Sequence, residues 1–91
     1  MEIDVFGVQK NKVRKVISIC KNEWECDNLD SYQDKKTGLY HVYMSGCDYL
    51  YAGQTENEFA KSLSHSIKSE DPTCKVNVNA LYLEGGNNYK Y

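Results

Sequence analysis

The stretch GLYHVYMSGCDYLYAGQTENEF, residues 38–59, holds two glycine-marked aromatic triplets. The triplets are Gly38-Leu39-Tyr40 and Tyr51-Ala52-Gly53. Between them, the sequence SGCD has the composition of a turn, and the runs on either side are rich in aromatic and branched residues that favour strands. The stretch therefore predicts a β-hairpin that pairs Leu39–Met44 with Tyr49–Ala52.

A helix is expected directly after the hairpin. Thr55, followed three residues later by Glu58, has the pattern of a capping box. The apolar residues then recur at helical spacing, at Phe59, Leu63 and Ile67. Pro72 restricts the residue before it, so the helix should end ahead of this proline.

The segment before the hairpin is less uniform. The alternation in EIDVF places Ile3 and Val5 on one face of a short first strand. Apolar residues from Val13 to Trp24 then follow one helical face, and Asn11 could cap this helix. The β-branched sequence VISI favours a strand instead, so both readings stay open, with the helix preferred. Asp27–Gly38 is polar and predicts a connector that ends in a turn at residues 34–38.

The segment after the helix alternates in the manner of a strand. In CKVNVNALYLE, Val76 and Val78 share one face and polar residues take the other. The following GGNN predicts a tail. Together these elements predict an α+β fold, a small antiparallel sheet with flanking helices, in a single domain over residues 1–91.

Composition sets the class of protein. The 91 residues are 41% hydrophobic and 26% charged, which is ordinary for one globular domain. The N-terminal MEIDVFGVQ has no long apolar run, so it predicts neither a signal peptide nor a membrane span, and we expect a cytoplasmic protein. The four cysteines, Cys20, Cys26, Cys47 and Cys74, have no short paired spacing, which favours free thiols over disulfides or a zinc site.

The net charge of -2 argues against a protein that binds nucleic acid over its whole surface. Any phosphate-binding surface must be local. The best candidate is KNKVRK, whose cations are Lys10, Lys12, Arg14 and Lys15. The alternative is that this run is only the solvated side of an amphipathic segment.

The two triplets, their spacing and the capped helix resemble the GIY-YIG nuclease family over residues 38–84, with residues 1–37 as an N-terminal extension. The resemblance implies a GIY-YIG-like fold and metal-dependent cleavage of nucleic-acid phosphodiesters. It assigns Tyr40 and Tyr51 to the surroundings of the phosphate and the attacking water. It also implies Mg²⁺ or Mn²⁺ as the cofactor if the chain is active, and none otherwise.

The remaining positions of the family pattern fit less well. A direct count from Gly53 places the family's helical arginine at Lys61, with His65 one turn further on. Alignment by the apolar stripe places it at Ser62 instead, which supplies no cation. The metal-binding glutamate has Glu84 as its only nearby substitute, and the alternative for Glu84 is an exposed acid that closes a strand.

This incomplete set favours a catalytically degenerate module that binds a protein or nucleic-acid partner, possibly an inhibitor from a phage or mobile element. One alternative is an active divalent-metal-dependent endonuclease that uses Tyr40, Tyr51, Lys61 or Arg14, His65 and Glu84. A second alternative is an unrelated protein-binding inhibitor or immunity-type protein. No membrane partner is expected.

Overall fold

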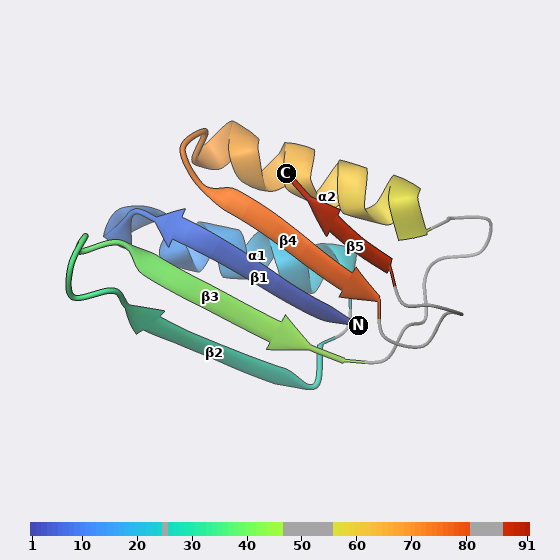
Figure 1. The fold of residues 1–91 in the computed structure, drawn as a ribbon, viewed down its shortest axis with the longest axis horizontal. Coiled ribbons are helices and arrows are strands. Elements are labelled where there is room, and N and C mark those ends of the chain that lie inside the picture. Colours follow the sequence, from blue (N-terminus) through green and yellow to red (C-terminus); the bar gives the residue numbers. More distant parts are fainter. Residues whose placement is uncertain (25, 47–55, 81–86) are drawn as a thin grey trace.

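A computed structural model of the chain describes residues 1–24, 26–46, 56–80 and 87–91. Within these ranges the chain forms five strands, two α-helices and one short 3-10 helix (Figure 1). In chain order the elements are β1 Glu2–Val8, η1 Lys10–Lys12, α1 Val13–Glu23, β2 Asn28–Gln33, β3 Tyr40–Ser45, α2 Glu56–Glu70, β4 Lys75–Ala80 and β5 Asn87–Lys90.

The strands form one antiparallel sheet in the order β2-β3-β1-β4-β5. Strand β1 lies in the centre and pairs with β3 on one side and β4 on the other. Because β1 and β2 are both antiparallel to β3, they run parallel to each other with β3 between them. The order from β1 to β4 is thus the split βαβ arrangement, βαββαβ, and β5 is added beside β4. The predicted α+β class with a small antiparallel sheet is confirmed.

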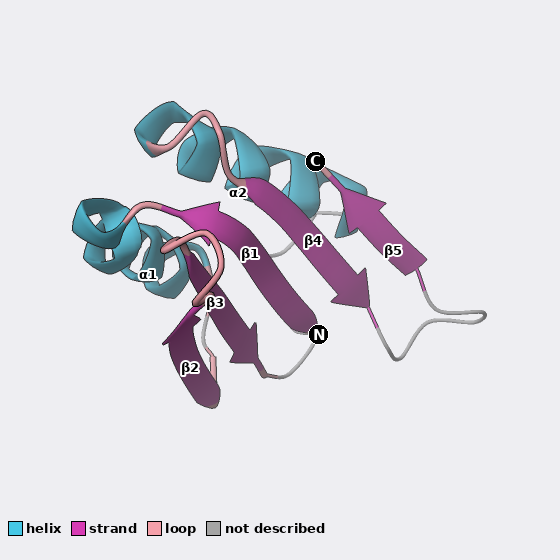
Figure 2. Ribbon diagram, turned by 60° about the vertical axis from the view of Figure 1, so that its left-hand side comes forward, coloured by secondary structure: helices cyan, strands magenta, loops and turns pink. Residues whose placement is uncertain are grey.

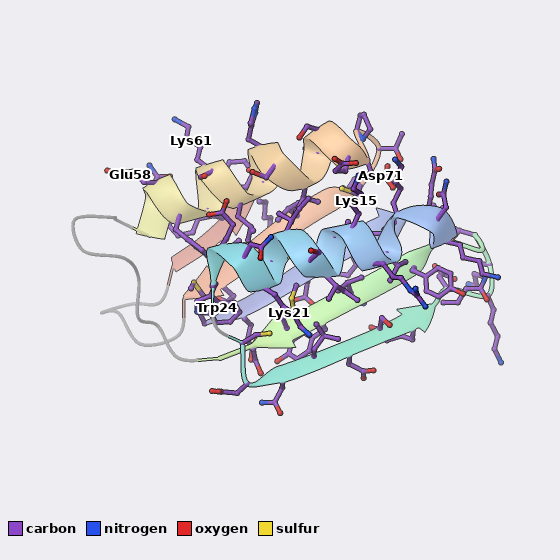
Figure 3. All side chains as sticks on the ribbon, turned by 180° about the vertical axis from the view of Figure 1, so that it is seen from behind. Lys15, Lys21, Trp24, Glu58, Lys61 and Asp71 are labelled. Carbon is purple, nitrogen blue, oxygen red and sulfur yellow. The ribbon has the colours of Figure 1, made fainter. Side chains whose placement is uncertain are left out.

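Both helices pack on the same face of the sheet (Figures 2 and 3). Helix α1 contacts β3, helix α2 contacts β4, and the two helices contact each other. Alternate strand residues point into this layer and are buried, among them Ile3, Val5, Val8, Val42, Met44, Val76 and Val78. In the described part of the chain no helix covers the other face, which we call the open face.

A bulge in β1 determines which residues reach the open face. Val5 pairs with Val42 and Val8 pairs with Tyr40, so β1 has one residue more than β3 between these pairs. Gly7 sits in the bulge with a φ of +74°, a conformation that glycine adopts readily. The extra residue keeps both Val5 and Val8 on the helix side and leaves Phe6 on the open face.

The ambiguous segment after β1 is a helix, which confirms the preferred reading. Val16, Cys20 and Trp24 recur every four residues and are all buried, so the apolar face prevails over the β-branched composition of VISI. The prediction that Asn11 caps this helix is wrong. Asn11 lies in η1, and the residue at the N-cap is Lys12, which makes no side-chain capping hydrogen bond.

Two polar segments that were predicted as irregular contain strands. The connector Asp27–Gly38 includes β2, and the expected tail includes β5. All six residues of β2 are exposed, so its sequence lacks the alternation that marks a half-buried strand. The turn that follows β2 is confirmed: the Asp34 carboxylate accepts a hydrogen bond from the Lys36 amide at 2.9 Å, and Gly38 has a φ of +76°.

The strands that form the hairpin differ in part from the predicted pair. Its first strand is confirmed as β3, but β3 pairs with β2 on one edge and with β1 on the other. Its second strand, Tyr49–Ala52, lies outside the described residues. The hairpin that the structure describes is therefore β2-β3, closed by the turn at residues 34–38.

The later elements agree with the expectations wherever they are described. Helix α2 buries Phe59, Leu63 and Ile67 and ends at Glu70, before Pro72. Strand β4 buries Val76 and Val78. The proposed cap Thr55 lies outside the described residues.

Three cysteines, Cys20, Cys26 and Cys74, are described as free thiols, and Cys47 lies outside the described residues. Burial is the main cause that raises the pKa of Cys20 to about 12, and the nearby Cys26 and Glu23 raise it further. Because the thiolate is the reactive form, a pulse of iodoacetamide on the native protein at pH 7.5 should alkylate Cys26 well before Cys20. Peptide mass spectrometry after the pulse measures both rates. The two rates should become similar after denaturation, whereas equal rates in the native protein would contradict the burial of Cys20.

Candidate nucleic-acid interface

The open face carries a row of three rings and one cation that crosses four strands. Tyr32 on β2 pairs with His41 on β3, and Phe6 on β1 pairs with Lys75 on β4. The bulge brings Phe6 beside His41, with their ring centroids 4.2 Å apart and their planes tilted by 34°. We call Tyr32, His41 and Phe6 the ring row.

Hydrogen bonds fix the central ring of this row. The Nε2 atom of His41 lies 2.7 Å from Oδ1 of Asp4, and Nδ1 is hydrogen-bonded to the Tyr32 hydroxyl. A carboxylate only accepts, so in neutral His41 the Nε2–H donates to Asp4, and Nδ1 accepts from the Tyr32 O–H. Both ring nitrogens are satisfied, and the three side chains are held in place before any ligand arrives.

The two outer rings are accessible. Phe6 is 42% exposed and Tyr32 is 53% exposed, so a ligand can reach both rings. Beside them is a hollow of about 550 Å³, with the ring row and Leu39 among its lining residues. This volume is in the range of small-ligand sites, so a flat aromatic group could enter and stack there.

Positive charge gathers at the same end of the molecule. This basic end is where β1 and β2 finish and where β3 and β4 begin, at the left of Figure 1. Of the eleven lysine and arginine residues only Lys21 and Lys61 lie elsewhere, which leaves nine. The nine are Lys10, Lys12, Arg14, Lys15, Lys35, Lys36, Lys68, Lys75 and Lys90.

Five of the described carboxylates lie at the basic end. Asp4 and Asp30 lie in the same cross-strand row as Lys90, on either side of Tyr43, and Asp4 also contacts His41. The other three lie near the strand ends and have partners within the protein. Asp34 accepts the Lys36 amide in the turn, and Glu70 lies 3.7 and 3.8 Å from the ammonium groups of Lys12 and Lys15. Asp71 is buried and accepts the Gln9 amide at 3.0 Å. Nine cations against these five carboxylates leave an excess of about four positive charges at this end, which the overall charge of -2 conceals.

The predicted basic segment therefore forms part of a larger surface. Lys10 and Arg14 are exposed and line a shallow hollow with Asn11. Lys12 and Lys15 instead lie against Glu70 of α2, so part of their charge is offset within the protein. The cations that supplement them come from elements distant in the sequence.

The predicted catalytic residues do not come together in the described part of the structure. Tyr40 packs against the core on the helix side of β3. Lys61 and His65 are exposed on α2, and Figure 3 shows Lys61 directed away from the sheet. Tyr51 and Glu84 lie outside the described residues, and among the residues that are described no group of three acidic, histidine or cysteine side chains could hold a metal ion.

Sequence reasoning missed most of the ring row. Phe6 and His41 fall within predicted strands and Tyr32 within the predicted connector, and no sequence pattern assigns the three a shared role. Their sequence separation of 26 and 9 residues gives no local motif. The one available signal was the alternation of EIDVF and LYHVYM, which places Phe6 and His41 opposite the buried residues.

Comparisons with protein-family models, with curated proteins and with solved structures found no match to this chain. The resemblance to GIY-YIG nucleases stays a prediction, because nothing found in these comparisons tests it. The described helices include none that is long and apolar enough to cross a membrane.

Proposed function

We propose that this chain is a binding module for single-stranded nucleic acid, and that the ring row and the basic end form its contact surface. The observation that carries the proposal is the combination of two accessible rings, one of them held by a hydrogen bond, with unpaired cations on an uncovered sheet face. Sheets that present aromatic side chains in this way stack the unpaired bases of single strands, while lysines track the phosphates. No cleavage is part of the proposal.

The arrangement suits bases better than a protein side chain. A base offers a flat π-face to Phe6 and Tyr32. The phosphates of the strand carry the negative charge that the nine cations would offset. Because hydrogen bonds already hold Tyr32 and His41, little side-chain freedom is lost on binding. A duplex should bind more weakly, since its bases are already stacked.

Replacing Phe6 or Tyr32 with alanine should each weaken the binding of a short single strand by about 5- to 150-fold, the equivalent of about 1–3 kcal/mol per stacked base. Fluorescence anisotropy with labelled RNA and DNA strands of the same sequence measures this loss and shows which sugar is preferred. The matched control is Leu29→Ala, because Leu29 is 40% exposed on β2 but pairs with Met44 on the helix side. Equal losses for Leu29→Ala and Tyr32→Ala, or no binding by the wild type, would overturn the proposal.

The contribution of the cations to strand binding is tested by measuring affinity at several salt concentrations. Removing one phosphate-binding cation from a single-strand site should lower the slope of log affinity against log salt concentration by about 0.7. Lys75→Gln should show this change, since Lys75 adjoins Phe6 in the row. Lys61→Gln removes the same charge outside the basic end and should leave the slope unchanged. An equal effect of the two substitutions would show that only net charge matters.

A further inference from the structure

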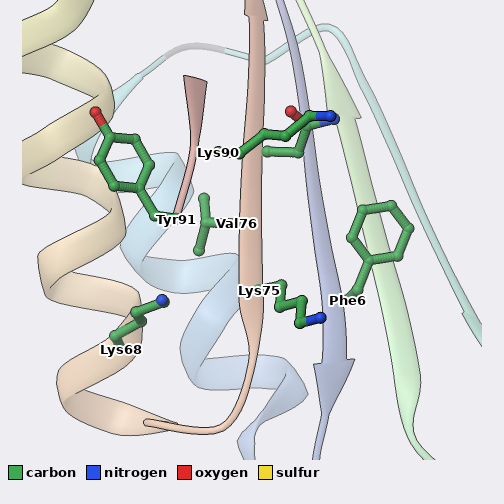
Figure 4. Close-up of a pocket in the computed structure, with 7 residues that line it drawn as sticks. Phe6, Lys68, Lys75, Val76, Lys90 and Tyr91 are labelled. Atoms are coloured by element: carbon green, nitrogen blue, oxygen red, sulfur yellow. The ribbon is translucent and has the colours of Figure 1, made fainter. Parts of the chain in front are cut away.

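A second hollow lies on the other side of Phe6, at the edge of the sheet where β5 ends. It measures about 560 Å³ and reaches from the open face around β4 toward α2 (Figure 4). Tyr91 closes one side by pairing with Val76 through two backbone hydrogen bonds of 2.8 and 2.9 Å. Phe6 lines both this hollow and the one beside the ring row, so the two are neighbours.

Three ammonium groups from three different elements line this second hollow. Lys68 comes from α2, Lys75 from β4 and Lys90 from β5 (Figure 4). No carboxylate side chain of the described residues lines it, and none lies within ion-pair distance of these three lysines. Three like charges around one hollow repel each other, so the site favours an anion that carries more than one negative charge.

The aromatic residues that line the second hollow indicate which chemical group is attached to the anion. Phe6 is accessible on the open face, and Tyr91 packs against the core on the helix side of β4 (Figure 4). A phosphate monoester carries about -1.5 to -2 charges at neutral pH, whereas a phosphodiester within a strand carries one. Lysines bind phosphate as point charges, and an aromatic wall accepts a base. A nucleotide that ends in a phosphate monoester meets both requirements.

We propose that the hollow between Phe6 and Tyr91 binds a nucleotide through its phosphate monoester, held by Lys68, Lys75 and Lys90. The source is either the phosphorylated end of a strand or a free mononucleotide. In the first case the inference rests on the proposed function, and the site fixes which end of the strand enters the ring row. In the second case it stands independently.

The experiment compares one hexanucleotide in 5′-phosphorylated, 3′-phosphorylated and unphosphorylated forms, together with adenosine monophosphate and adenosine. Calorimetry on the full chain should show about tenfold tighter binding for one phosphorylated end, because hydrogen bonds between charged groups are the strong ones. In Lys68→Gln/Lys90→Gln the ratio between phosphorylated and unphosphorylated strands should fall to about one. Lys21→Gln/Lys61→Gln, which removes the same charge elsewhere, should keep the ratio of the wild type.

The outcomes separate the two proposals. Equal binding of all three strands, with adenosine monophosphate no better than adenosine, overturns the phosphate site and leaves strand binding intact. Binding of adenosine monophosphate that depends on Lys68 and Lys90, without binding of any strand, supports the site and overturns the proposed function. Circular dichroism confirms that each variant is folded, so that lost binding is not mistaken for unfolding.

Discussion

Replacing Phe59 with alanine should lower the free energy of unfolding by about 3–5 kcal/mol, the usual cost of emptying a buried phenylalanine site. Phe59 is 1% exposed and lies edge-on to Trp24, with ring centroids 6.5 Å apart, where α2 meets the end of α1. The loss would consume much of the roughly 5–15 kcal/mol that stabilises a domain of this kind. Trp24 is the only tryptophan, so its fluorescence during urea unfolding reports this region directly.

Phe6→Ala is the matched control for that experiment. It makes the same chemical change at a side chain that is 42% exposed, and surface changes of this kind usually alter stability by less than about 1 kcal/mol. The two variants should therefore separate stability from function: Phe59→Ala destabilises the fold, and Phe6→Ala weakens strand binding in a folded protein. Similar urea midpoints for the two variants would contradict the described core.

Replacing Asp71 with alanine should cost about 2–4 kcal/mol, because hydrogen bonds to a buried carboxylate would be lost and their donors left unsatisfied. Asp71 is 2% exposed and joins the end of β1 to the turn between α2 and β4. It accepts the Gln9 amide at 3.0 Å and the Thr73 hydroxyl at 2.8 Å. Asp27→Ala, a change to an exposed carboxylate, should stay within about 0.5 kcal/mol.

The same carboxylate predicts a pH dependence. Burial alone would raise the pKa of Asp71, but the hydrogen bonds from Gln9 and Thr73, with the nearby Lys12, outweigh it and lower the pKa. Its folded pKa lies below its unfolded value, so its contribution to stability is present above the unfolded pKa of about 3.9 and is lost as the pH falls through the folded pKa. The difference in unfolding free energy between wild type and Asp71→Asn should therefore shrink between pH 6 and pH 2. A difference that stays constant over this range would show that the charge contributes nothing.

The elements that could be predicted share one property, an apolar pattern that repeats within a single segment. The faces of α1 and α2, and the alternation in β1, β3 and β4, are each set by residues close in sequence. The edge strands were missed for the opposite reason. Strand β2 has six exposed residues, and what makes it a strand is the backbone of β3 beside it.

The candidate site also combines features that adjacent residues set with features that only the fold brings together. KNKVRK could be identified as basic because its cations are adjacent, whereas Lys35, Lys68 and Lys75 join them only when the sheet closes. The ring row likewise depends on cross-strand register and on the extra residue at the bulge, and neither has a local signature.

The sequence by itself determined the α+β class, the two helices, the central strands and the free thiols expected at the described cysteines, because local periodicity and composition control them. Only the tertiary structure decided that β3 pairs with β1 and β2, and that the positive charge of an acidic chain collects at one end. Strand pairing depends on which backbone edges come together. The hydrogen bonds and side-chain contacts that stabilise a pairing come from segments far apart in the chain. The opening stretch accordingly contributed strand β3 and its His41 to the proposed interface. The cations that complete it come from η1, α1, the turn after β2, α2, β4 and β5.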